Sequence, residues 1–180
     1  NDIWLNEGFA TFGEHLANEK LLMTNSQFMS YLSSEMNYIT SSAGGSVYVS
    51  DTNLGNTGAI FSGRLSYSKG GYVVRMIKWI LGDDAFYSAL KDYHARPQLA
   101  YGYAKTEDLK NSLLESTGKD FTEFFNDWIY GQGHPTYQIR GNQTADQMLR
   151  FKVSQTTSHS SVNVFEMPLP IKVNGTGGQV

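Results

Sequence analysis

Few side chains of this 180-residue sequence could bind a metal ion or take part in catalysis. There is no cysteine, so any metal ion must take nitrogen or oxygen ligands, and disulfides and cysteine nucleophiles are excluded. The four histidines supply no metal site by themselves. His94 and His159 have no partner at ligand spacing, His134 precedes Pro135 in a turn-like sequence, and His15 lies about 100° around its predicted helix from the preceding acid.

Two carboxylates lie on one predicted helix. Glu7 belongs to the string from Trp4 to Thr11 and stands at a helix start, where a negative charge is favoured electrostatically. Glu14 follows seven residues later, which is two helical turns, so both carboxylates share one face. A lone first-turn glutamate is most often an exposed acid, so the spacing alone assigns no function to Glu7.

Tyr67 is a third candidate. It belongs to the string from Leu65 to Gly71, directly after a long glycine-containing segment of a kind that is often functional in compact domains. The chain contains 11 tyrosines, so a core or loop tyrosine is the alternative interpretation. Lys69 is expected to support packing or a helix-start contact, and Gly70 and Gly71 to allow close approach of another helix.

The elements that must position these residues are mostly helices. Apolar residues recur at helical spacing, and the third apolar segment is hydrophobic all round, which predicts central burial. Ser26 and Ser68 are expected to cap the second and third helices. The predicted helices span Glu7–Leu22, Ser26–Ile39, Ser68–Leu81, Asp83–Tyr93, Thr106–Ser116 and Asp120–Tyr130.

Two regions lack helical periodicity. Residues 40–64 contain five glycines and predict a long ordered loop, in which Val47–Val49 could form a short strand. After Pro135, apolar and polar residues alternate as they do in half-buried strands. The predicted strands span Tyr137–Arg140, Met148–Ser154 and Val162–Val173. The sequence therefore predicts an α+β fold, with a helical part over residues 1–135 and a β-rich domain over residues 136–180.

The composition excludes several classes of protein. The formal net charge is -3 and the 14 basic residues are scattered, so the electrostatic footprint of a nucleic-acid-binding protein is missing. No apolar run approaches the roughly 18 to 20 residues of a membrane-spanning helix. Many Ser, Thr, Asn and Gly residues and the lack of cysteine favour an extracytoplasmic or secreted protein, but the compartment and the oligomeric state stay open. The first residues contain no initiator methionine, so we expect the chain to be part of a longer protein.

Three strings of the chain resemble the M1 family of zinc aminopeptidases, which are gluzincins. Trp4 to Ala10 matches the family pattern W-L-N-E-G-F-A, Leu65 to Gly71 is similar to its Y-x-K-G segment, and Phe121 to Pro135 is similar to the F-F-x-x-W and G-x-P segment. The resemblance implies the mainly helical C-terminal part of a gluzincin catalytic domain over residues 1–135. The first strands of a β-sandwich domain would follow over residues 136–180, and both domains would be incomplete.

The resemblance also implies roles for individual residues. In that family two histidines of an H-E-x-x-H helix and a glutamate of the next helix bind zinc, and water takes the open position. Glu7 would be that glutamate. Tyr67 would donate a hydrogen bond to the oxyanion of the tetrahedral intermediate, which suits a neutral phenol. Glu14 either accepts a hydrogen bond from a metal-bound histidine or is a solvated acid.

No H-E-x-x-H string occurs in the chain, so both zinc histidines and the general-base glutamate are missing from it. We expect the intact protein to bind Zn²⁺ and to hydrolyse the N-terminal residue of peptides with a free N-terminus. The chain alone is expected to be inactive and to hold no zinc firmly. The alternative is a non-catalytic M1-like scaffold or peptide-binding module, against which the presence of both Glu7 and Tyr67 argues.

Overall fold

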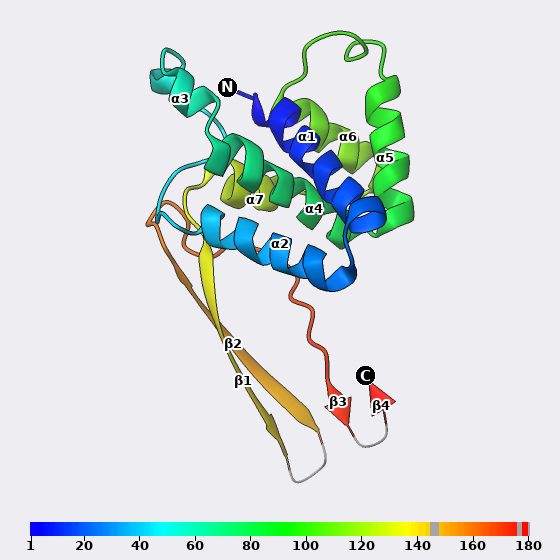
Figure 1. Ribbon diagram of the computed structural model, residues 1–180, viewed down its shortest axis with the longest axis vertical. Coiled ribbons are helices and arrows are strands. Elements are labelled where there is room, and N and C mark those ends of the chain that lie inside the picture. The colour runs from blue at the N-terminus through cyan, green and yellow to red at the C-terminus, as the bar shows by residue number, and fades with distance from the viewer. Residues whose placement is uncertain (145–147, 176–177, 180) are drawn as a thin grey trace.

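The computed structural model describes residues 1–144, 148–175 and 178–179, with side chains up to residue 173. Figure 1 shows a body of packed helices from which a long β-hairpin projects. Helices precede strands along the chain, which confirms the predicted α+β class. In order the elements are α1 (Trp4–Ala17), π-helix η1 (Asn18–Leu22), α2 (Asn25–Ile39), 3-10 helix η2 (Asp51–Asn53), α3 (Thr57–Ile60), π-helix η3 (Gly63–Lys69), α4 (Gly70–Leu81), α5 (Asp83–Ala95), α6 (Thr106–Thr117), α7 (Thr122–Phe125), π-helix η4 (Asn126–Tyr130), β1 (Pro135–Gln143), β2 (Leu149–Thr157), β3 (Asn174–Gly175) and β4 (Gly178–Gln179).

The core of the helical body is aromatic and aliphatic. Trp4 of α1 packs edge-to-face on Phe125 of α7, with 6.4 Å between ring centroids, and Phe12 of α1 packs in the same way on Phe86 of α5 at 5.5 Å. Burial of such rings supplies both area and fixed geometry. The largest fully buried side chains include Trp4, Ile77, Phe86, Leu109, Leu113, Phe121, Phe125, Ile129 and Phe165.

α1 and α4 touch through glycines. A Cβ atom on Gly8 would lie 2.8 Å from the carbonyl carbon of Gly70, and one on Gly71 would lie 2.8 Å from the γ-methyl group of Thr11. Both distances are shorter than Cβ contacts in proteins allow, so the two backbones approach this closely only because these positions are glycine. Gly70 and Gly71 thus have the packing role expected from the sequence.

Two predicted N-caps are wrong. α2 is capped by Thr24, not Ser26, because Gln27 completes a capping box in which the Thr24 hydroxyl accepts from the Gln27 N–H. Ser68 lies buried inside a continuous helix. The helical turns of η3 extend this helix backwards from α4, so its N-cap is Ser62, whose hydroxyl accepts from the Leu65 N–H.

The predicted helix boundaries otherwise shift by a few residues, and the predicted loop holds three short helical pieces. α1 begins at Trp4 rather than Glu7, and α7 begins at Thr122 rather than Asp120, whose carboxylate accepts from the Thr122 N–H. Residues 40–64 contain η2, α3 and the start of η3. Val47 and Val49 are buried but form no strand. α4 buries Val73, Val74 and Ile77, whereas Trp79 is exposed, so its burial is one-sided.

The strand predicted over Val162–Val173 is also wrong, because these residues have no neighbouring strand. Side chains satisfy the backbone instead. The Gln155 amide group bonds both the N–H and the carbonyl of Phe165, and Asp127 accepts from the Glu166 N–H. The prolines at 168 and 170 remove two donors that a strand would use. The segment is therefore irregular, with Phe165 anchored against Trp128, their ring centroids 4.7 Å apart.

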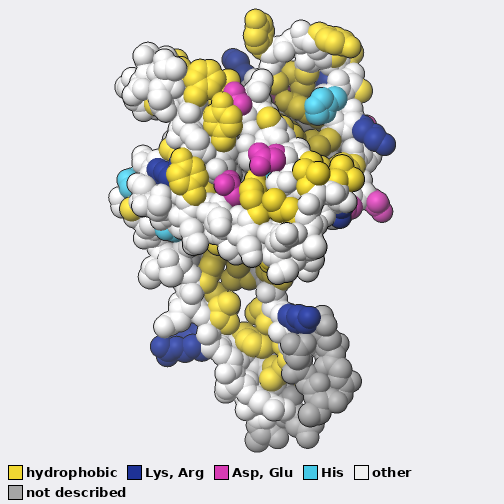
Figure 2. Space-filling model, viewed as in Figure 1, with side chains coloured by type: hydrophobic (Ala, Val, Ile, Leu, Met, Phe, Trp, Pro, Cys, Tyr) yellow, Lys and Arg dark blue, Asp and Glu magenta, His cyan; other side chains and the backbone are white. Residues whose placement is uncertain are grey.

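β1 and β2 form an antiparallel hairpin in which Ile139 is opposite Val153 and Gly141 is opposite Phe151. Because side chains alternate along a strand, Ile139, Phe151 and Val153 share one face, where they are 52%, 42% and 40% exposed. Figure 2 shows hydrophobic side chains gathered along this projecting part. None of the helices in the described part of the chain is long and apolar enough to cross a membrane.

His15 is fully buried in the helical body, between α1, α2 and α4. Its ring packs edge-to-face on Tyr31 and Tyr72, with 5.7 Å between centroids in each case, and neither ring nitrogen has a hydrogen-bond partner among the residues that the structure describes. Burial, followed by the positive charge of Arg75, lowers the pKa of His15 from 6.5 to about 4. The imidazole is therefore neutral in the folded protein near pH 7.

The glycine contact predicts a difference between two Gly→Ala substitutions in one helix. In an open helix position this substitution stabilises by about 0.5 to 1 kcal/mol. Gly13→Ala, with no atom within 4 Å of the new Cβ, is expected to do so. Gly8→Ala is expected to destabilise by about 1 to 3 kcal/mol, because α1 and α4 must separate. Urea unfolding measures both; equal effects would show that the contact does not constrain the helices.

Burial of His15 predicts a loss of stability in acid. The unfolded state binds a proton below pH 6.5 but the folded state only below about pH 4, so stability falls between these values, by about 2 kcal/mol from pH 7 to pH 5. His15→Phe should flatten this fall in stability between pH 7 and pH 5 and should raise stability. His15→Asn should flatten it without raising stability, because a polar atom stays buried. If stability falls in acid by the same amount in both variants, other titrating groups cause the fall.

Candidate active site

Glu7 lies in the first turn of α1, at the side of the helix that faces η3. Its N–H donates to the Ile3 carbonyl at 3.0 Å, and its side chain is half-buried. The N-cap residue is Ile3, which provides no side-chain cap. Glu7 therefore places a negative charge at the positive end of a helix that has no capping side chain of its own.

Tyr67 lies in η3, a π-helix, where its N–H donates to the Ser62 carbonyl at 3.3 Å. π-helical turns are rare and are often found at functional sites. Desolvation raises the pKa of the Tyr67 phenol above 10, and hydrogen bonding to Glu7 and the negative charge of Glu7 raise it further. The phenol is thus a neutral hydrogen-bond donor at neutral pH.

The structure brings Glu7 and Tyr67 together, although 59 residues separate them in the chain. The contact follows from the helix packing, because Gly8 comes directly after Glu7 and Gly70 comes three residues after Tyr67. The close approach of Gly8 to Gly70 sets these neighbouring side chains side by side. Two residues that the sequence singles out separately therefore lie next to each other in the folded protein.

Lys69 is held inside the protein rather than at this site. It is 3% exposed, and its ammonium group donates to the Gly133 carbonyl at 3.0 Å. Burial, followed by the charge of Arg64, lowers the pKa of Lys69 from 10.5 to about 8. The bond ties η3 to the segment that leads into β1, in keeping with the packing role expected from the sequence.

Glu14 is exposed two turns farther along α1. Its carboxylate accepts from the Tyr31 hydroxyl of α2 at 3.1 Å, and desolvation together with this bond raises the pKa of Tyr31. Both interpretations of Glu14 remain predictions, since the carboxylate has a protein partner and also faces solvent.

Of the two residues at the candidate site, Glu7 offers a carboxylate that could bind a metal ion. Within residues 1–144, 148–175 and 178–179, no three His, Cys, Asp or Glu side chains gather in a metal-binding arrangement. The histidines are dispersed: His15 is in the core, His94 is exposed on α5, and His134 and His159 contact Ser158 and Ser161 near the hairpin. The half-buried Glu7 carboxylate suits zinc as one ligand of a larger set.

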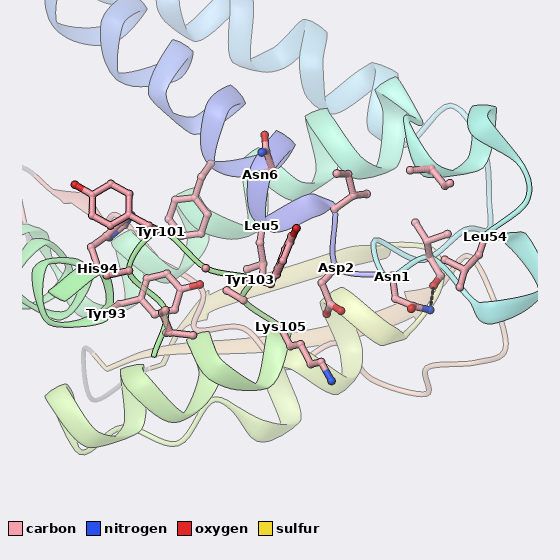
Figure 3. A pocket seen from close by; sticks show the side chains of 18 residues that line it. Asn1, Asp2, Leu5, Asn6, Leu54, Tyr93, His94, Tyr101, Tyr103 and Lys105 are labelled. Atoms are coloured by element: carbon pink, nitrogen blue, oxygen red, sulfur yellow. Dashed lines mark hydrogen bonds between the residues drawn. The ribbon is translucent and has the colours of Figure 1, made fainter. Parts of the chain in front are cut away.

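Two features near Glu7 were not predicted from the sequence. A groove of about 990 Å³ runs beside the start of α1, and its lining includes Leu5, Asn6, Tyr93, Tyr101 and Tyr103 (Figure 3). A buried hydrogen-bond network also joins the start of α1 to the start of α6. Both features combine segments far apart in the chain, so no local string of residues could have indicated them.

Known proteins are similar in sequence to this chain. A model of the Peptidase family M1 domain matches residues 1–128. Probable aminopeptidase 2 of Sulfurisphaera tokodaii is 29% identical over 97% of this chain and 22% of its own length. Aminopeptidase M1-A of Oryza sativa subsp. japonica is 30% identical over 94% of this chain and 19% of its own length. The chain thus spans about a fifth of the length of these relatives.

A solved structure shares the fold. The crystal structure of Legionella pneumophila aminopeptidase A in complex with aspartic acid matches 86% of this chain and 17% of that chain, with a TM-score of 0.66 and 19% identity. The family model begins at the first residue, includes both Glu7 and Tyr67, and ends close to the last helix. A match of that extent shows that the chain belongs to peptidase family M1.

Proposed function

We propose that the protein containing this chain is a zinc aminopeptidase that removes N-terminal residues from peptides with a free N-terminus. The observation that carries the proposal is the pairing of Glu7 with Tyr67 across the contact between α1 and η3. The names of the related aminopeptidases support the same activity. The domain division is proposed with it, residues 1–135 belonging to the catalytic domain and residues 136–180 beginning a β-sandwich domain.

Glu7 is proposed as the one zinc ligand that this chain provides. A carboxylate lowers the net charge at the metal and leaves room for a water molecule beside it. When bound, zinc would polarise the scissile carbonyl and activate that water molecule. The two histidine ligands and the general-base glutamate would come from outside these 180 residues, so we expect the chain alone to bind zinc weakly and to have no activity.

Tyr67 is proposed as the donor that stabilises the oxyanion. A phenol is protonated at neutral pH, and the proximity of Tyr67 to Glu7, the proposed metal ligand, supports this role. Once the Glu7 carboxylate binds the metal, the phenol is free to donate to the substrate carbonyl oxygen. That hydrogen bond strengthens as negative charge develops, so it favours the transition state over the bound substrate.

Removal of the Tyr67 hydroxyl tests its role. In the full-length protein, Tyr67→Phe is expected to lower kcat about 100-fold to 1000-fold, the usual effect of losing one oxyanion donor, with little change in KM and in zinc content. The matched control is Tyr87→Phe, which removes an exposed phenol on α5. It should keep normal kinetics. A normal kcat for Tyr67→Phe would remove this residue from the mechanism.

Zinc content tests the ligand assignment and the scaffold alternative together. The full-length protein is expected to hold about one zinc ion per chain by metal analysis, whereas a clearly lower content would favour the non-catalytic scaffold. Glu7→Gln should release the metal during dialysis, because a neutral amide is a poor zinc ligand. Glu14→Gln should weaken binding about 10-fold if Glu14 supports a metal-bound histidine, and have no effect if it is a solvated acid.

A further inference from the structure

The first turn of α1 is not held by a cap of its own. Its N-cap residue is Ile3, whose apolar side chain cannot accept from the helix N–H groups. Backbone carbonyls, those of Asp2 and Ile3, accept from the N–H groups of this turn. Helix ends without a capping side chain are less stable and tend to fray. Glu7 lies in this turn, so contacts that other helices make with the turn help to hold the Glu7 backbone in place.

A buried threonine from another helix provides that contact. The Trp4 indole N–H donates to the Thr106 hydroxyl at 2.9 Å, and the Thr106 hydroxyl donates to the Asp2 carboxylate at 2.6 Å. Trp4 is 0% exposed and Thr106 is 1% exposed. Only a hydroxyl group accepts and donates in this way, so serine could replace threonine here but valine could not.

Asp2 makes a second connection between the segment before α1 and the start of α6. Its carboxylate also accepts from the Thr106 N–H at 2.9 Å. Thr106 is the first residue of α6, and this N–H is one of the unsatisfied donors at a helix N-terminus, where a negative charge is favoured. Asp2, two residues before α1, thus accepts from the first N–H of α6, while the first residue of α6 holds the first residue of α1.

Trp4 connects these hydrogen bonds to Glu7, because both residues belong to the first turn of α1. It precedes Glu7 by three residues in the same helical turn, and its Cβ atom would lie 3.6 Å from a Cβ atom on Gly70 of α4. The indole ring also packs on Phe125. Trp4 is therefore held by α6 and α7 and lies close to the backbone of α4, and these contacts also restrain the helical turn that carries Glu7.

We propose that Thr106 is a positioning residue for the Glu7 carboxylate, acting through Trp4 and Asp2. This inference rests on the proposed role of Glu7 as a zinc ligand. Loss of the Thr106 hydroxyl leaves a buried indole N–H without an acceptor and removes one of two bonds from Asp2. The first turn of α1 then loosens, and the metal site loses the preorganisation that supporting hydrogen bonds provide.

The test is zinc affinity of the full-length protein, measured by competition with a chelator. Thr106→Val is expected to weaken zinc binding about 10-fold, as loss of a supporting hydrogen bond at a metal site does, and Thr106→Ser should restore it. The matched control is Thr117→Val, which removes a hydroxyl bonded to the Leu113 carbonyl at the other end of α6. It should keep normal zinc affinity even where thermal stability falls.

Each outcome is decisive for one assignment. If Glu7→Gln loses zinc while Thr106→Val keeps normal affinity, the positioning role is wrong and the proposed function stands. If Glu7→Gln keeps zinc, the ligand assignment fails and the positioning role fails with it. Should Thr106→Val not fold, Trp4→Phe replaces it, because this change removes the indole N–H and keeps a buried ring. Normal zinc affinity in Trp4→Phe would then overturn the inference.

Discussion

The contact between Gly8 and Gly70 is the constraint on which the candidate site depends. The two helix backbones come so close that a side chain at position 8 would meet the backbone of α4 at 2.8 Å. Glu7 and Tyr67 are placed next to these glycines along their own helices, so the backbone contact also sets the distance between the side chains. The two glycines, which have no reactive side chain, thereby determine where the side chains of Glu7 and Tyr67 meet.

Three polar side chains are buried in or against α1 and η3, and the protein accommodates each of them in a different way. Thr106 uses both functions of its hydroxyl, so its burial is compensated. Lys69 donates to one carbonyl, and burial, followed by the charge of Arg64, lowers its pKa. His15 has no acceptor or donor and stays neutral at the expense of stability in acid. The first two tie separate segments to α1 and η3, whereas the third only fills space.

Much of the fold follows from local sequence patterns. The spacing of apolar residues predicts most of the helices and the change from helix to strand after Pro135, because amphipathic periodicity is a property of a single element. The wrong predictions concern which residues cap the helices and whether a segment has a neighbouring strand. Thr24 and Ser62 act as caps because of where the helices begin, and residues 162–173 form no strand because the side chains of Gln155 and Asp127 satisfy their backbone.

The site divides in the same way. The strings around Glu7 and Tyr67 determine which residues are candidates, because each string is contiguous in the sequence. Only the tertiary structure decides that these residues meet, that a π-helix presents Tyr67, and that Thr106 holds Trp4 from 102 residues away. Such contacts depend on how closely helices pack and on which buried donors find acceptors. Those are properties of the assembled core rather than of any one segment.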